Sequence, residues 1–140
     1  MLDEPSHLEG IGVALVSVPR FERALERFGE RLLERVFTPA EVAYARRKRH
    51  GSQSLAARFA AKCAGRSLLR TWRAGSPCLR DLEVARRPSG EPMLALNGPA
   101  GEAVASRRLR FALSLAHDAQ FAVASLWAER EMADAPDVLR

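Results

Sequence analysis

The stretch RFAAKCAGRS, residues 58–67, decides how this chain should fold. Its apolar residues recur at intervals of three and four, the spacing that places side chains on one face of a helix. The same apolar face extends in both directions through Leu55, Phe59, Cys63 and Leu69. Gly51 interrupts the pattern before this stretch, and Ser52 can cap a helix that follows it. We therefore expect a long central helix that ends near residues 72–75.

Cations recur along the same helix at every fourth position. They are Arg58, Lys62, Arg66 and Arg70. Like charges at this spacing repel one another, so the row costs stability unless an anionic ligand or glutamates of a neighbouring helix face it. A solvated arginine-rich face and a phosphate-binding face are both consistent with the pattern.

Apolar runs separated by turn residues predict strands around this helix. Residues 10–18 form a β-rich apolar run that indicates a buried strand. Short alternating runs at 82–84 and 93–96 flank a segment rich in proline and glycine, which predicts a hairpin. A second pair of strands is expected at 109–115 and 121–127.

Helical periodicity predicts the remaining elements. An apolar face that begins at Phe21 continues to Val36, which favours one helix from Arg20 onward. The residues TPAE at 38–41 match a capping box with proline at the first helical position, so a new helix should start there and run to His50. A short helix is expected at 99–106.

These elements together predict an α+β domain with an antiparallel sheet packed on the long helix. We expect one domain at residues 8–128, with polar tails at 1–7 and 129–140. A chain of 140 residues with 47% apolar residues can bury one modest core, so we expect one functional site.

Composition narrows the class of partner. Lys and Arg outnumber Asp and Glu by 22 to 17, a formal charge of +5 that favours an acidic partner. The basic run RRKRH at 46–50 has few aromatic neighbours, which argues against nucleic acid, and at a helix end it also complements the helix dipole. The sequence has no apolar run of the ~20 residues that span a membrane. Two cysteines and no apolar leader favour a cytoplasmic thiol protein.

Five segments together resemble holo-acyl-carrier-protein synthase, the small phosphopantetheinyl transferase of bacteria. The family segments GIGIDIV, FTxxE, RFAAKEA, SGKP and SLSH[TDE] correspond here to residues 10–16, 37–41, 58–64, 89–92 and 114–118. The resemblance covers most of the chain, from Gly10 to Trp127.

The resemblance implies a compact homotrimer with active sites between subunits, which moves the phosphopantetheine of coenzyme A to a serine of an acyl carrier protein. It implies nucleotide contacts from the basic helix, the glycine turn and the strand end. On this chain those positions are Arg58, Lys62, Arg66, Ser89, Gly90, Pro92, Ser114, His117 and Asp118. It also implies carrier-protein contacts, which we expect at Arg20, Arg46 and Arg47.

The departures from the family pattern concentrate at the chemistry. The strand aspartate that would hold Mg²⁺ is Ala14, and the helix glutamate is Cys63. The second lysine of the helix, the turn lysine and the serine before the histidine are Ser67, Glu91 and Ala116. Because Mg²⁺ requires hard oxygen ligands, we expect no Mg²⁺ at the family position and loss of the standard transfer reaction.

Three functions remain open from the sequence. The chain could bind a carrier protein and a coenzyme A or pantetheine-bearing ligand without catalysis. It could be a repurposed enzyme in which Lys62, Cys63 and His117 act on carrier-bound thioesters, although Cys63 also fits a plain core position. It could retain transfer with a displaced metal held by Glu41, by Asp118 or by an acid from another subunit, although Glu41 is explained as a helix cap and Asp118 as a turn residue.

Overall fold

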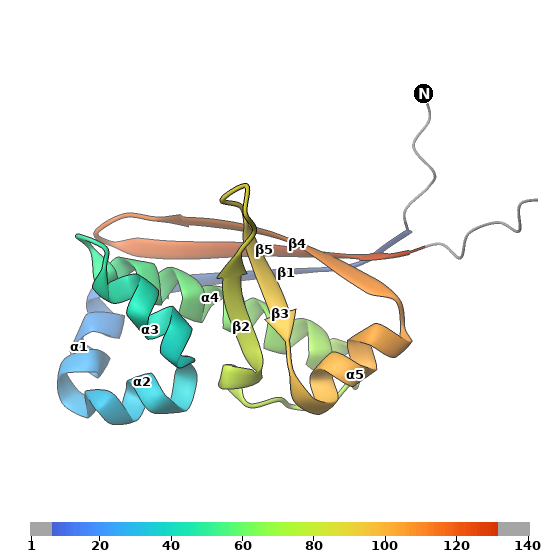
Figure 1. The fold of residues 1–140 in the computed structure, drawn as a ribbon, viewed down its shortest axis with the longest axis horizontal. Coiled ribbons are helices and arrows are strands. Elements are labelled where there is room, and N and C mark those ends of the chain that lie inside the picture. The colour runs from blue at the N-terminus through green and yellow to red at the C-terminus, as the bar shows by residue number, and fades with distance from the viewer. Residues whose placement is uncertain (1–6, 132–140) are drawn as a thin grey trace, which may run out of the picture.

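A computed structural model of the chain describes residues 7–131. In chain order the elements are β1 (His7–Ser17), α1 (Val18–Phe28), α2 (Glu30–Val36), α3 (Pro39–Arg46), α4 (Gly51–Thr71), the 3-10 turn η1 (Leu79–Asp81), β2 (Leu82–Arg86), β3 (Pro92–Leu96), α5 (Gly98–Ser106), β4 (Leu109–His117) and β5 (Phe121–Arg130). Figure 1 shows the sheet of β1, β5 and β4 along one side of the molecule, with helices on the other side. The predicted α+β class is therefore confirmed.

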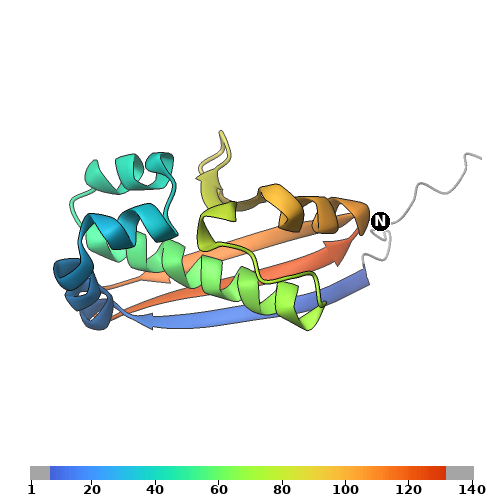
Figure 2. The same ribbon diagram turned by 90° about the horizontal axis from the view of Figure 1, so that it is seen from below.

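The main sheet is antiparallel, with strand order β1-β5-β4, and the β2-β3 hairpin forms a second, separate sheet. α4, 21 residues long, runs across one face of the main sheet (Figure 2). In β5 the residues that face α4 are buried, and they are Ala122, Ala124, Leu126 and Ala128. Small side chains at most of these positions let the helix approach the sheet closely.

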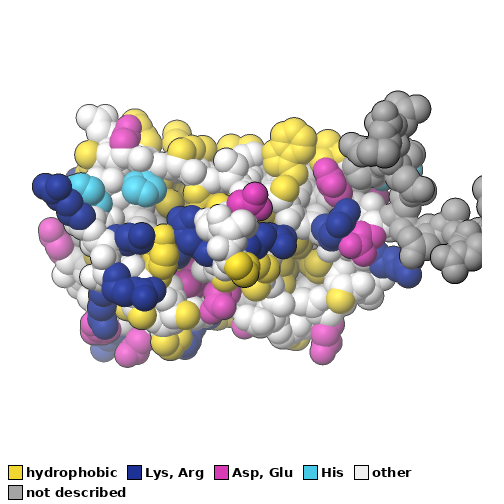
Figure 3. Space-filling model, turned by 45° about the horizontal axis from the view of Figure 1, so that its top comes forward, with side chains coloured by type: hydrophobic (Ala, Val, Ile, Leu, Met, Phe, Trp, Pro, Cys, Tyr) yellow, Lys and Arg dark blue, Asp and Glu magenta, His cyan; other side chains and the backbone are white. Residues whose placement is uncertain are grey.

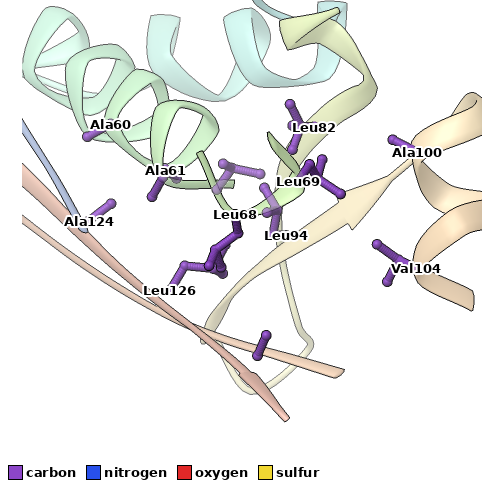
Figure 4. Close-up of a cluster of buried hydrophobic side chains, with 13 residues drawn as sticks. Ala60, Ala61, Leu68, Leu69, Leu82, Leu94, Ala100, Val104, Ala124 and Leu126 are labelled. Carbon is purple, nitrogen blue, oxygen red and sulfur yellow. The ribbon is translucent and has the colours of Figure 1, made fainter. Parts of the chain in front are cut away.

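The contact between β1 and α4 is unusually close at Gly12. A Cβ atom added to Gly12 would lie 2.7 Å from the carbonyl oxygen of Ala64. Behind this contact, α4 packs with the hairpin, α5 and β5 in one apolar cluster that includes Leu68, Leu82 and Leu126 (Figure 4). The close packing of β1 on α4 therefore requires glycine at position 12, within the first family segment.

A second apolar cluster joins α1, α2 and α3 to the first half of α4. Phe21 packs edge to face on Phe37, with ring centroids 6.2 Å apart. The predicted single helix from Arg20 is wrong, because Gly29 adopts φ +52° and separates α1 from α2. Such a conformation is accessible to glycine at little cost.

The predicted capping box before α3 is confirmed. The Thr38 hydroxyl accepts from the backbone of Glu41, and the Glu41 carboxylate accepts from the backbone N–H of Thr38. The helix ends at Arg46, however, rather than at His50.

The domain boundaries shift slightly outward. β1 begins at His7 and β5 continues to Arg130, so these residues of the predicted tails belong to strands. The rest of the predicted tails, apart from Glu131, lies outside the described residues. Within residues 7–131, none of the helices combines the length and apolar character that a membrane crossing needs.

The face of the main sheet opposite α4 carries large apolar side chains that no other part of residues 7–131 covers. Val13 and Leu15 of β1 are 65% and 66% exposed, and Ile11 is 48% exposed. Phe121 and Trp127 of β5 add exposed rings to this face. We call these five residues the open sheet face.

Candidate functional site

Four cationic side chains surround the ring of Tyr44. The guanidinium carbon of Arg58 lies 4.1 Å from the ring centroid, and Lys48 Nζ lies 4.8 Å from it. The guanidinium carbons of Arg86 and Arg47 lie 5.3 Å and 6.0 Å away. We call these five residues the Tyr44 cluster. They come from α3 and the residues just after it, from α4 and from β2, so three elements meet at one ring.

Arg58 is the most buried member of the cluster, with 3% of its surface exposed. Its Nη1 donates to the Ser54 hydroxyl at 2.9 Å, while its Nε has no hydrogen-bond partner within the described part of the chain. Burial lowers the pKa of Arg58, and the neighbouring Tyr44 and Glu41 act in the opposite direction. A guanidinium remains charged under such a shift. The buried guanidinium adds its charge to those of the neighbouring cations, a combination that favours an anion at the exposed part of the cluster.

The phenol of Tyr44 responds to its neighbours. Burial alone would raise the pKa of Tyr44, but a hydrogen bond from Lys48 and the charges of Arg86, Lys48 and Arg58 outweigh it and lower the pKa. The cluster is therefore a local region of positive potential.

The hairpin turn is attached to this cluster. Arg86 Nη1 donates to the carbonyl oxygen of Gly90 at 2.7 Å, and Gly90 adopts φ +94°. Ser89 is exposed beside it. Glu91 and Pro92 line a hollow of about 440 Å³ together with residues of β4. The predicted nucleotide positions Arg58, Ser89 and Gly90 are thus brought to one region, whereas Pro92 faces a different hollow.

Basic side chains gather over the left half and the centre of the face in Figure 3, with histidine side chains beside them at the left. The hairpin projects over the middle of the molecule in Figure 1. The face in Figure 3 therefore carries positive charge over a wide area.

Lys62 does not belong to a ligand surface in the single chain. Its Nζ donates to Glu41 Oε1 at 2.7 Å, to Leu82 O at 2.8 Å and to Leu79 O at 3.0 Å, and its side chain is fully buried. All three ammonium protons are thus used. Burial lowers the pKa of Lys62, and Glu41 opposes that shift. The expectation that Lys62 contacts a ligand or acts in catalysis stays a prediction, and in the single chain the core holds its donors.

The row of four cations on α4 thus has a mixed environment. Arg58 and Lys62 are buried, Arg66 is half-buried and Arg70 is exposed. The sequence left open whether a ligand or a neighbouring glutamate offsets their repulsion. Glu41 of α3 does so for Lys62.

Ala14 and Cys63 occupy the two positions where the resemblance implies Mg²⁺ ligands. Ala14 lies two residues after Gly12 on the same face of β1, and Gly12 contacts Ala64, the neighbour of Cys63. Burial raises the pKa of the Cys63 thiol, with Arg66 partly offsetting it. A methyl group and a neutral thiol do not fit Mg²⁺. Among residues 7–131, no three His, Cys, Asp or Glu side chains lie close enough together to hold a metal ion.

The carboxylates that could hold a displaced metal already have other partners. Glu41 is almost fully buried and accepts from Lys62 and from backbone N–H groups. Asp118 accepts from the backbone of Gln120 and Phe121 at 2.7 and 2.8 Å, which lowers the pKa of its carboxyl group. This arrangement closes the β4-β5 turn, the role that its position in the sequence also suggested.

The structure does not bring Cys63 and His117 together within one chain. The His117 Nδ1 atom lies 3.1 Å from Oε1 of Gln53, near the start of α4. Gln53 and Cys63 are ten residues apart on that helix, about 15 Å along its axis. A thiolate and imidazole pair therefore does not form in the single chain.

The remaining predicted positions are dispersed. Ser114 lies on the outward face of β4, opposite Ser125. Arg46 is exposed and pairs with Glu30 at 3.3 Å. Arg20 lies at a groove of about 310 Å³. The apolar residues of that groove include Leu15, Phe21, Leu32 and Phe59.

Sequence reasoning missed three members of the site region. Arg86 carried no motif, Lys48 was noted only as part of the basic run at 46–50, and Tyr44 stood out only as a lone aromatic near those cations. The one available signal was the position of Arg86 at the end of a strand that precedes the glycine turn. Which helix that strand end would meet could not be read from the sequence.

Comparisons with known proteins agree with this geometry. Residues 10–124 match the family model of the 4'-phosphopantetheinyl transferase superfamily. The chain is 47% identical over 116 residues to the holo-[acyl-carrier-protein] synthase of Desulforudis audaxviator, an alignment that covers 82% of this chain and 88% of that protein. It is 40% identical over 118 residues to the synthase of Koribacter versatilis, covering 84% and 94%.

A similar fold occurs in the solved ACPS–CoA complex from Chronobacterium ammoniagenes. The TM-score is 0.73 at 29% identity, and the match covers 87% of this chain and 97% of that one. The chain belongs to the 4'-phosphopantetheinyl transferase superfamily, within its holo-acyl-carrier-protein synthase type.

Proposed function

We propose that this chain binds coenzyme A or a related phosphopantetheine-bearing ligand, together with an acyl carrier protein, and has lost the Mg²⁺-dependent transfer reaction. The observation that carries the proposal is one contrast within the site. The cations that would meet phosphate groups are present in the Tyr44 cluster, whereas Ala14 and Cys63 stand where the family holds its metal.

The Tyr44 cluster supports the ligand part of the proposal. Arg58 contributes its charge from below the surface, and exposed Arg86 holds the glycine turn. Guanidinium groups suit phosphate because their donors match its oxygens in pairs. The similar protein from Chronobacterium ammoniagenes is described as a complex with CoA, which favours coenzyme A as the first ligand to test.

Arg20 and the groove beside it support the carrier-protein part. Arg20 is exposed at the start of α1, next to apolar side chains of the groove such as Phe21 and Leu32. A cation next to an apolar hollow suits an acidic helix that also presents apolar side chains. Arg47 is exposed on the α3 side of the molecule and would extend the same positive field.

The open sheet face supports a homotrimer, the assembly that the family resemblance implies. Its exposed side chains, Val13 and Leu15 above all, form a contiguous apolar surface across β1 and β5. Monomeric proteins seldom leave such a surface uncovered. Light scattering after size exclusion should give three times the chain mass, and Val13→Asp with Leu15→Asp should give a smaller species.

Loss of transfer follows from the chemistry of the two metal positions. Phosphoryl-type transfer depends on positioning and on neutralisation of charge by a metal and by cations. Ala14 supplies no ligand, and Cys63 supplies a protonated thiol at neutral pH. Glu91, in place of the family's lysine, adds negative charge near the turn.

Two measurements test the proposal together. Calorimetry should detect coenzyme A binding that weakens with salt, and Arg58→Met and Arg86→Met should weaken it further. Intact mass of an apo carrier protein incubated with coenzyme A and Mg²⁺ should remain unchanged.

A restored variant makes the second measurement sharper. Ala14→Asp together with Cys63→Glu returns two carboxylates to the metal positions, and should produce some transfer if the scaffold is otherwise intact. The matched control is Cys63→Gln with Ala14→Asn, which has similar size but no pair of charges. Efficient transfer by the unmodified chain would overturn the loss of catalysis, and an absence of coenzyme A binding would overturn the ligand assignment.

A further inference from the structure

We propose that the buried pair Glu41 and Lys62 is the positioning element of the Tyr44 cluster, the device that holds three separate elements at the spacing an anionic ligand needs. Neither residue lies on the ligand side. Each acts through the segments to which it is bonded. The inference rests on the proposed ligand site, but its structural part can be tested without a ligand.

The pair connects α3, α4, η1 and β2 through one compact set of hydrogen bonds. Glu41 accepts from Lys62 at 2.7 Å, from the Thr38 backbone N–H at 3.0 Å and from the Val84 backbone N–H at 3.2 Å. Both side chains are almost fully buried. Lys62 also binds the carbonyl oxygens of η1 and of the start of β2, as described above.

Three residues of this hydrogen-bond set lie close in sequence to a member of the Tyr44 cluster, at the spacing that places two side chains on the same side of a helix or strand. On α3, Glu41 and Tyr44 are three residues apart, and on α4, Lys62 and Arg58 are four apart, so each pair shares a helical face. On β2, Val84 and Arg86 are two residues apart and thus lie on the same side of the strand. The last member of this set, Arg86, contacts Tyr44. Hydrogen bonds that join Glu41, Lys62 and Val84 therefore also fix the distances among Tyr44, Arg58 and Arg86.

The charges of the cluster make such a link necessary. Arg58, Lys48 and Arg86 converge on one ring, and among residues 7–131 none of them forms an ion pair. Like charges at these distances repel, so without other restraints the three elements would move apart. The pair restrains them and is itself neutral overall, because one carboxylate faces one ammonium. The positive potential of the cluster is therefore left available to a ligand.

The test uses a built-in probe, since Tyr44 is the only tyrosine in the sequence. Its phenolate absorbance in an alkaline titration reports how closely the cations surround the ring. The main variant is Glu41→Gln with Lys62→Met, which removes both charges and most of the links while leaving net charge unchanged. The milder variant Glu41→Asp keeps the charge and shortens the side chain by one methylene. The matched control is Val104→Ala, a core change in α5, outside the cluster.

In the double variant we expect the Tyr44 titration to move up towards the ordinary tyrosine pKa of about 10. Affinity for adenosine 3',5'-bisphosphate should fall about tenfold, the effect of losing one charge-assisted hydrogen bond. Glu41→Asp should raise the Tyr44 titration and lower the bisphosphate affinity by smaller amounts. These two measurements on Glu41→Asp test the inference if the double variant does not fold. Val104→Ala should leave both unchanged.

Wild-type Tyr44 titration in a folded double variant, or in folded Glu41→Asp if the double variant does not fold, would overturn the inference. A shifted titration with unchanged affinity for the bisphosphate would also overturn it, because positioning would then have no consequence for the ligand. If the unmodified chain does not bind the bisphosphate at all, the proposed ligand site fails, and the tyrosine titration still decides whether the pair positions the cluster.

Discussion

Replacement of Lys62 by methionine should be among the most destabilising single changes in this chain. Methionine matches the length of lysine but supplies none of its three hydrogen bonds. The change leaves the Glu41 carboxylate buried without its counterion, and it leaves the carbonyl oxygens of Leu79 and Leu82 without the donor that now serves both. Removal of one partner of a buried pair costs about 3–5 kcal/mol.

The magnitude should lie inside that range rather than above it. Glu41 keeps the backbone N–H groups of Thr38 and Val84, which continue to stabilise its charge. Proton uptake by Glu41 can also limit the loss. A free energy of unfolding of about 5–15 kcal/mol is usual, so the change removes a large part of the total. Each kilocalorie corresponds to roughly 3–4 °C of melting temperature for a domain of this size.

Urea unfolding of four proteins, at one protein concentration because assembly affects apparent stability, gives the answer. They are the unmodified chain, Lys62→Met, Glu41→Gln and the double variant. We expect the double variant to be more stable than the sum of the single changes predicts, by about 2 kcal/mol or more, because both buried charges are then gone. Additive losses, or a loss below about 1 kcal/mol for Lys62→Met, would refute the reasoning.

Three further results are expected. Gly12→Ala should lower the urea midpoint by the equivalent of about 1–3 kcal/mol, since its Cβ would lie 2.7 Å from the Ala64 carbonyl oxygen, and an unchanged midpoint would mean that β1 and α4 are less close. Iodoacetamide near neutral pH should modify exposed Cys78 well before Cys63, whose pKa is raised by burial. Peptide mass spectrometry measures the modification of both thiols. Faster reaction at Cys63 would contradict its description as a buried, protonated thiol. Backbone hydrogen bonds from the β4-β5 turn hold the pKa of Asp118 below its ordinary value, so its stabilising contribution is present above about pH 4 and lost as pH falls through the lower folded pKa. Asp118→Ala should therefore make the unfolding free energy less dependent on pH below that point, and an unchanged acid slope would contradict this.

Local rules in the sequence were enough to predict most elements of the fold. The capping box at Thr38 and Glu41 depends on residues only three apart, and it forms as expected. The hairpin around Gly90 likewise depends on its own turn residues. The break at Gly29 was missed because the apolar periodicity continues across it, and periodicity does not report whether a glycine adopts a positive φ.

Long-range partners could not be predicted in the same way. Lys62 looked like one cation in a row of four, and only the fold places Glu41, 21 residues earlier, against its ammonium group. Arg86 joins the Tyr44 cluster because β2 meets α3 in space, a contact that no local pattern encodes. Motif matching assigned Arg58, Lys62 and the glycine turn to the ligand alike, because it could not show that the core holds the donors of Lys62.

The electrostatic cost of the residues differs between positions 14 and 63 and the Tyr44 cluster. At the positions where the resemblance implies Mg²⁺ ligands, two carboxylates without a metal would repel each other, whereas half-buried Ala14 and Cys63 carry no such cost. The Tyr44 cluster is the opposite case, because it keeps several cations at one ring against their mutual repulsion. A fold that needed only stability would not retain such an arrangement, and sites that break local rules in this way are often functional. We therefore propose that the function of this chain depends on an anionic ligand at the cluster more than on chemistry at Cys63.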